Sequence, residues 1–238
     1  MTPRLNINGV WPSSITISSG WSRASARPWC DDPNISLIRL IRGGPRFLSE
    51  ATSHLMGLGS ETVLSPPLYR SATSIWRKSG FEERYRLEIM ERALALPVAD
   101  PATPVIGTAD PPWPEIVELD HRAFEGIWRM SEAGLKEALD ATGAATILLA
   151  GDKAIEGYAL VGTQWGVSYL HRIAVAPSSQ GRGVGAGLVR AAIGWARSTL
   201  SRVMVLNVRP ANEEARRLYQ REGFTDTGRH LHLLGYGA

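Results

Sequence analysis

A glycine-rich segment at residues 180–186 has the residue types of an anion-binding loop. Its sequence is Gln-Gly-Arg-Gly-Val-Gly-Ala, and it follows an apolar strand pattern at 169–176 and a Pro-Ser-Ser turn. Glycine has no Cβ, so the backbone can bend sharply and a phosphate can approach its N–H groups closely. Apolar residues then recur at helical spacing, namely Val184, Leu188, Ala191, Ala192 and Trp195. The segment therefore predicts a pyrophosphate site at the positive end of a helix.

Two other glycine loops that bind nucleotides fit this segment poorly. No Gly-Lys-Ser/Thr follows the glycines, which excludes a Walker loop. Gly181, Gly183 and Ala186 satisfy the Gly-x-Gly-x-x-Gly/Ala pattern of a dinucleotide site. That site places its glycines directly after the strand and an acid about twenty residues later, whereas residues 176–179 intervene here and the later region reads Leu-Asn. A dinucleotide-dependent oxidoreductase is therefore disfavoured but kept as a third hypothesis.

A strand and a second helix follow at residues 201–206 and 211–222. Asn212 is a natural N-cap residue, and Glu213 and Glu214 suit the positive end of the helix. Gly223 stands where helices commonly end. Tyr219 lies on the apolar face of this helix, where it serves either as a core aromatic or as a functional side chain.

The two patterns together resemble the signatures of the GCN5-related N-acetyltransferase (GNAT) superfamily. These are Gln/Arg-x-x-Gly-x-Gly/Ala after a strand ending in Val-x-Pro, and Asn-x-x-Ala-x-x-Leu-Tyr-x-x-x-Gly-Phe. The resemblance implies an α/β fold with a mixed, mainly antiparallel central sheet flanked by helices, and acetyl-CoA as cosubstrate. It also implies two strands that separate into a V for the thioester. The residues implied in cofactor binding are Ile173, Ala174, Val175, Gln180, Gly181, Arg182, Gly183, Val184, Gly185, Ala186 and Asn212.

The resemblance also divides the catalytic work. Tyr219 would donate its phenolic proton to the departing thiolate, and Asn207 would orient the cofactor together with Asn212. His171 is the first candidate for a general base because its ordinary pKa is near neutrality. Weaker base candidates are Glu156 and Asp120, and a chain of water molecules is an equal alternative. A plain surface role for His171 is slightly favoured over a catalytic one. The residues expected around the acceptor amine are Phe124, Trp128, Arg129, His230 and His232.

An internal repeat extends the resemblance to the first part of the chain. Residues 71–90 align with 214–233, so that Gly80-Phe81 matches Gly223-Phe224 and Trp76 matches Tyr219. A strand is expected at 37–41 and a helix at 47–58, joined by residues 42–45, which are too short for the glycine cradle. The repeat indicates a tandem protein whose N-terminal copy is degenerate and binds no CoA.

We expect four segments from this reading. Residues 1–34 are expected to be irregular, 35–95 to form the degenerate copy, 96–103 to be a linker, and 104–238 to be the catalytic domain. The catalytic domain should have the element order βααβββαβαβ.

Composition limits the remaining possibilities. The 238 residues carry a net charge of +3 with no block of like charge, which argues against a nucleic-acid partner. The single cysteine excludes an intramolecular disulfide, and no cluster of ligands at metal-binding spacing is present. Without an apolar membrane span or a signal-peptide pattern, we expect a cytoplasmic monomer or homodimer acting on an amine acceptor, either a small molecule or a peptide. The alternative is a non-catalytic acyl-CoA-binding sensor or scaffold.

Overall fold

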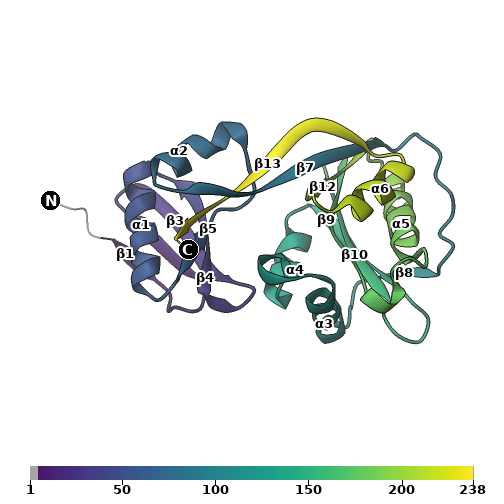
Figure 1. The fold of residues 1–238 in the computed structure, drawn as a ribbon, viewed down its shortest axis with the longest axis horizontal. Coiled ribbons are helices and arrows are strands. Elements are labelled where there is room, and N and C mark those ends of the chain that lie inside the picture. The colour runs from purple at the N-terminus through teal and green to yellow at the C-terminus, as the bar shows by residue number, and fades with distance from the viewer. Residues whose placement is uncertain (1–4, 238) are drawn as a thin grey trace. The chain divides into compact units, whose positions relative to one another are not determined.

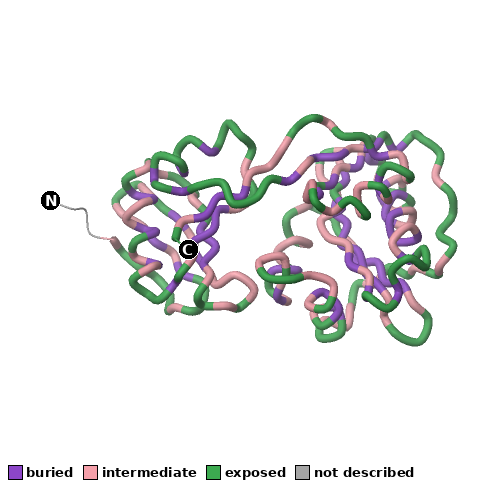
Figure 2. Tube along the Cα trace, in the orientation of Figure 1, coloured by how far each residue is buried: buried purple, intermediate pink, exposed green. Residues whose placement is uncertain are grey.

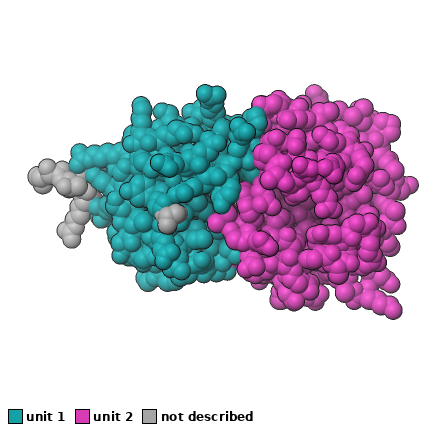
Figure 3. Space-filling model, in the orientation of Figure 1, with its two compact units in different colours: residues 1–87, 230–238 teal, residues 88–229 magenta. Residues whose placement is uncertain are grey.

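The computed structural model describes residues 5–237, and the chain divides into two compact units. Unit 1 contains residues 1–87 with 230–238, and unit 2 contains residues 88–229 (Figure 3). No helix among the described residues has both the length and the apolar character needed to cross a membrane.

Unit 2 has the predicted element order, which is confirmed (Figure 1). From residue 105 onward its elements are β8 (Val105–Thr108), α3 (Trp113–Ala123), α4 (Glu132–Asp140), β9 (Ala144–Ala150), β10 (Gly157–Gln164), β11 (Val167–Val175), α5 (Val184–Ser198), β12 (Val203–Val208), α6 (Glu213–Arg221) and the start of β13 (Thr225–Gly237). A short 3-10 turn, η2 (Gly126–Trp128), lies between α3 and α4.

The sheet of unit 2 has helices on both faces. Its strand order is β7-β12-β11-β10-β9-β8, and only the β11/β12 pair is parallel. Apolar residues of α5 and α6 pack on one face, and those of α3 and α4 pack on the other. The first six residues of β10 are all buried because this strand is covered from both sides (Figure 2).

Unit 1 contains a small sheet with a helical layer, which corrects the expectation of irregular structure for residues 5–34; residues 1–4 of that segment lie outside the described residues. Its elements are β1 (Asn6–Asn8), β2 (Ile15–Ser19), β3 (Ser22–Trp29), β4 (Asp32–Arg42), α1 (Pro45–Gly57), β5 (Thr62–Leu64), β6 (Leu68–Tyr69), α2 (Thr73–Lys78) and the start of β7 (Glu82–Ala93). The strands were missed because their buried faces alternate with serines and use small residues. Ile15, Ile17, Ala24 and Ala26 face the core, and small or polar residues separate them.

The internal repeat is visible in matched backbone geometry. β4 pairs with β5 in parallel, as β11 does with β12, in both cases over three residues. Gly80 and Gly223 end the equivalent helices α2 and α6 with φ of 87° and 85°. The backbone amide of Phe81 then donates to the carbonyl of Trp76, and that of Phe224 donates to the carbonyl of Tyr219.

The side chains of the two copies also correspond. Ser36 of β4 is hydrogen-bonded to Ser60, and Ser168 of β11 is hydrogen-bonded to Ser201. Trp76 and Tyr219 are both buried, and each makes an edge-on contact with the phenylalanine five residues later. In unit 1 the connection from β4 to α1 contains only Gly43 and Gly44. The expected loss of the glycine cradle from this copy is therefore confirmed as a structural fact.

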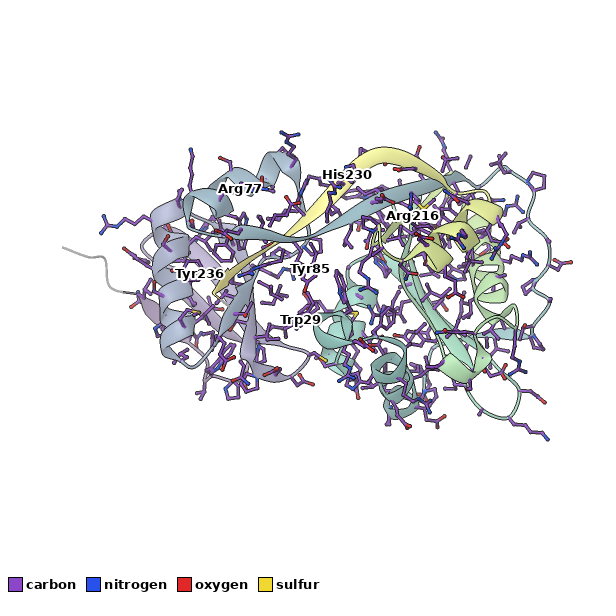
Figure 4. The ribbon with its side chains drawn as sticks, in the orientation of Figure 1. Trp29, Arg77, Tyr85, Arg216, His230 and Tyr236 are labelled. Atoms are coloured by element: carbon purple, nitrogen blue, oxygen red, sulfur yellow. The ribbon has the colours of Figure 1, made fainter. Side chains whose placement is uncertain are left out.

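The last strand of each copy pairs in the other unit. β7 follows α2 of unit 1, yet its residues 88–93 pair with β12 of unit 2. β13 follows α6 of unit 2, yet its residues 235–237 pair with β5 of unit 1. β7 even supplies an ion-pair partner to α6, because Glu88 Oε2 lies 2.9 Å from Nε of Arg216. Arg216 is labelled on α6 in Figure 4.

This exchange changes the domain boundaries expected from composition. Unit 2 begins at residue 88 rather than at residue 104, so the expected linker at 96–103 lies inside it. Residues 230–238 belong to unit 1 rather than to unit 2. A Pro- and Ala-rich segment indicates a surface connection, but it carries no information about which distant strand completes a sheet.

Candidate active site

The parallel strands β11 and β12 separate after three paired residues. Tyr169 and Val205 form the last pair, although β11 continues to Val175 and β12 to Val208. A β-bulge lies at the same point, because Leu160 of β10 is opposite Arg172 and the next residue, Val161, is opposite Leu170. The bulge leaves His171 without a partner and bends the strand. The separation gives the V between strands that the resemblance implied.

The glycine loop lies after the free end of β11 and opens α5. Gly181 and Gly183 have φ of 74° and 86°, a backbone conformation that favours glycine, and a Cβ on either would meet no atom within 4 Å. Gly185 has a different role, because its Cβ would lie 3.2 Å from a methyl group of Leu218. Two glycines therefore shape an open loop, and the third allows α5 and α6 to approach.

The amides of this loop are available to a ligand. Gly183 is the N-cap of α5 and has no side chain to cap it. Within the described residues, no loop carbonyl or side chain accepts a hydrogen bond from the N–H groups of residues 181–186. Unsatisfied N–H groups at a helix N-terminus, together with the helix dipole, form a site for phosphate.

Side chains of the loop are held by the protein itself. The amide of Gln180 donates to the carbonyl of Val175 at 3.3 Å, which ties the loop to β11. Arg182 pairs with Glu156 at 3.0 Å and remains largely exposed. Glu156, one of the weaker base candidates, is therefore a partner of the loop.

Tyr219 of α6 is buried, with 5% of its surface exposed. Burial raises the pKa of its hydroxyl to about 12, and the positive charge of Arg172 opposes that rise. Its hydroxyl makes no hydrogen bond within the described residues. The phenol is thus protonated at neutral pH, and its proton is not committed to another group of the protein.

The two asparagines have different surroundings. Asn207 is exposed and lies two residues beyond Val205, where β12 has already separated from β11. Asn212 is the N-cap of α6, and its side chain accepts a hydrogen bond from the amide of Ala215 at 3.2 Å. The predicted capping role of Asn212 is confirmed, because its side-chain oxygen is hydrogen-bonded to the first turn of α6.

His171 combines a suitable location with an enclosed ring. It lies at the bulge, its imidazole stacks on the ring of Tyr169 at 5.9 Å, and burial lowers the pKa of its side chain. Nε2 is buried without a hydrogen-bond partner, and a Cβ on Gly162 would lie 2.8 Å from it. The ring is therefore neutral at pH 7 and packs against β10 in this conformation.

Asp120 has a structural role that excludes it as a general base. Its fully buried carboxylate accepts hydrogen bonds from the hydroxyl of Tyr158 at 2.5 Å, from Nε and Nη2 of Arg172 at 2.8 and 2.9 Å, and from the amide of Met130 at 2.8 Å. These bonds join α3 to β10, to β11 and to the segment just before α4. Sequence reasoning missed this network because its members are distant in the chain and follow no spacing rule.

The segment between α3 and α4 carries three of the five residues expected around the acceptor. The ring of Phe124 lies under the guanidinium of Arg172, with 3.6 Å between the ring centroid and the central carbon of the guanidinium. The carbonyl of Trp128 accepts a hydrogen bond from the same guanidinium at 2.6 Å. The carbonyl of Phe124 accepts from Arg129 at 3.1 Å. His230 and His232 belong to unit 1, where His232 contacts Glu83 at 2.9 Å.

A layered sheet with two separating parallel strands, a glycine loop on a helix and a buried tyrosine define the acyl-CoA N-acyltransferase fold. The sequence profile of the Acetyltransferase (GNAT) family matches residues 113–224. No curated protein matches the sequence.

Solved structures of the same fold cover nearly the whole chain. A tandem GNAT protein from the clavulanic acid biosynthesis pathway is 11% identical, with a TM-score of 0.64 over 94% of this chain and 82% of that one. A GCN5-related N-acetyltransferase from Sphaerobacter thermophilus is 18% identical, with a TM-score of 0.53 over 96% and 82%. One from Kribbella flavida is 13% identical, with a TM-score of 0.55 over 99% and 90%.

Residues 113–224 therefore form a GNAT acetyltransferase domain. The matched strand pairing in unit 1 and unit 2 agrees with the tandem organisation that the repeat predicted.

Proposed function

We propose that unit 2 transfers an acetyl group from acetyl-CoA directly to an amine. The observation that carries the proposal is the separation of β11 from β12 beside an open glycine loop whose amides are unpaired. The loop would bind the pyrophosphate through the N–H groups of residues 181–186. The dipole of α5 would add about 0.3–1 kcal/mol.

The pantetheine arm would lie along the free edge of β11. Ile173, Ala174 and Val175 pair with β10 on one side and have no strand partner on the side of β12. Amide groups of pantetheine would bond this edge as an additional strand does. The thioester would then lie near Asn207, between the separated strand ends.

The chemical step would need little more than positioning and one proton donor. The neutral amine attacks the thioester carbonyl carbon, the C–N bond forms, and the C–S bond breaks with its electron pair on sulfur. Tyr219 gives its proton to that sulfur, and the surplus proton of the amine goes to a base or to water. A raised pKa suits this role because the phenol stays protonated until the thiolate develops.

We propose His171 as the residue that accepts the amine proton, directly or through water. Support comes from its location at the bulge and from burial that keeps the imidazole neutral. Its enclosed Nε2 means that the ring has to turn, or a water has to enter, when the acceptor binds.

Calorimetry with acetyl-CoA and a screen of amines for CoA release test the proposal. Binding at one site together with amine-dependent thiol release supports it. Binding without transfer to any amine would favour the acyl-CoA sensor, and absence of binding would reject the glycine loop as the cofactor site.

A further inference from the structure

Arg209 is a cation without a counterion in unit 2. It directly follows Val208, the last residue of β12, and is partly buried. Its guanidinium lies over the ring of Trp128, 5.0 Å from the centroid. Within the described residues, no carboxylate pairs with Arg209 and its side chain makes no hydrogen bond. Arginine remains charged at any pH of interest and presents five N–H donors, so a partly desolvated guanidinium of this kind has unused binding capacity.

The charges around Arg209 are unbalanced. Arg172 is neutralised by Asp120, but Arg129, next to Trp128, donates only to a carbonyl and has no ion pair in the described part of the chain. Glu125 is the acid on this segment; it is exposed and forms no salt bridge with either arginine. Among the charged residues of unit 2 named here, Arg129, Arg172 and Arg209 therefore outnumber Asp120 and Glu125.

The location of Arg209 connects this charge to the separated strands. Arg209 is two residues beyond Asn207 on β12, and the carbonyl of Trp128 is bonded to Arg172, the first residue of β11 after the bulge. Arg209 follows β12, and Trp128 is hydrogen-bonded to β11. The contact between Arg209 and Trp128 therefore connects the two strands that form the V. A group bound by Arg209 would lie beside an acceptor amine that enters there.

We propose that the acceptor is an amine that also carries a carboxylate, and that Arg209 binds this carboxylate. The proposal rests on the amine acetylation proposed above and names its substrate class. A guanidinium fork matches the two oxygens of a carboxylate and forms charge-assisted hydrogen bonds. Phosphates of CoA are the other anions within the site, but the loop at residues 181–186 already offers them a place.

Chemical protection tests the site without relying on turnover. The protein saturated with CoA is treated with phenylglyoxal, and modification of Arg209 is followed by peptide mass spectrometry. L-alanine, L-phenylalanine and L-glutamate are each compared with the corresponding α-carboxamide. Slower modification of Arg209 with the acids than with the amides supports the proposal. Equal rates with all six compounds would overturn it.

Substrate selectivity gives the second measurement. For the acid that is acetylated best, kcat/KM should exceed that of its amide by about tenfold or more, as for a hydrogen bond to a charged group. Arg209→Gln should bring this ratio close to one, and Arg209→Lys should restore part of it. Arg217→Gln is the matched control, because Arg217 is an exposed arginine of the same unit paired with Glu213.

The outcomes separate the two proposals. If acids protect Arg209 but no amine causes release of CoA from acetyl-CoA, acetyl transfer is rejected and the carboxylate site is kept. Acetylation with an unchanged acid-to-amide ratio in Arg209→Gln would keep transfer and reject the carboxylate site. A loss of CoA affinity in Arg209→Gln as large as the loss in kcat/KM would assign Arg209 to a phosphate of CoA and overturn the proposal.

Discussion

Asp120 and Arg172 form a two-point ion pair beneath the segment that connects α3 to α4. Nε and Nη2 of the arginine lie 2.8 and 2.9 Å from the two carboxylate oxygens, and the carboxylate is inaccessible to solvent. The pair holds Trp128 and Phe124 in place and leaves the guanidinium charge near Tyr219. One buried carboxylate therefore fixes both the acceptor-side segment and part of the electrostatics at the proposed proton donor.

Asp120→Asn should lower the free energy of unfolding of unit 2 by about 3–5 kcal/mol, because it leaves a buried guanidinium without its counterion. Urea denaturation followed by fluorescence measures this change. Glu213→Gln is the control, since its pair with Arg217 is exposed and should contribute no more than about 1 kcal/mol. A loss for Asp120→Asn as small as that of the control would contradict the network.

Tyr219→Phe should lower kcat by about 10²- to 10⁴-fold, the usual contribution of a positioned general acid. Affinity for acetyl-CoA should stay the same, because the ring and its contact with Phe224 are kept. Trp76→Phe changes the equivalent position of unit 1 and should leave kcat of the folded protein unchanged. Unaltered turnover in Tyr219→Phe would make Tyr219 a packing residue.

Gly183→Ala should weaken acetyl-CoA binding by at least tenfold, since a Cβ at φ of 86° strains the loop and fills space in front of its amides. Gly194→Ala is the matched control on the same helix. It has ordinary helical backbone and open space around its Cβ, so it should keep affinity and add up to about 1 kcal/mol of stability. Calorimetry and thermal unfolding of both variants distinguish lost binding from lost folding.

The stability of the protein should depend on pH through the buried imidazole of His171. Its folded-state pKa is lowered by burial, so its contribution to stability is present above the ordinary value of about 6.5 and is lost as pH falls through the lowered pKa. His171→Asn should flatten the acid side of the stability profile. If His171 is the base, the same variant should also remove the acid limb of kcat/KM, measured with an acceptor whose amine pKa is known.

Leu234→Ala should destabilise unit 1 by about 2–5 kcal/mol, although the residue follows the catalytic unit in the chain. Leu234 is fully buried in the cluster of Ile17, Ile38 and Leu55. Its amide donates to the hydroxyl of Ser65. Hydrogen exchange localised to β4 and α1 measures the effect. Unchanged protection there would contradict the assignment of β13 to unit 1.

Local patterns in the sequence predicted most of unit 2. Gly181 and Gly183 need positive φ, Asn212 needs to cap α6, and apolar residues of α5 repeat every three or four positions. Each of these depends on neighbours within a few residues, so each can be read without knowing the rest of the fold. The alignment of Trp76 with Tyr219 likewise revealed the repeat before its geometry was known.

Long-range contacts decided the remainder. The strands of residues 6–29 are short and rich in serine, and only packing on α1 distinguishes their two faces. The exchange of β7 and β13, the four hydrogen bonds at Asp120, and the contact of Arg209 with Trp128 join residues far apart in the chain. Periodicity and capping act within one or two turns of the backbone, whereas strand partners and buried charges are selected by the complete tertiary core.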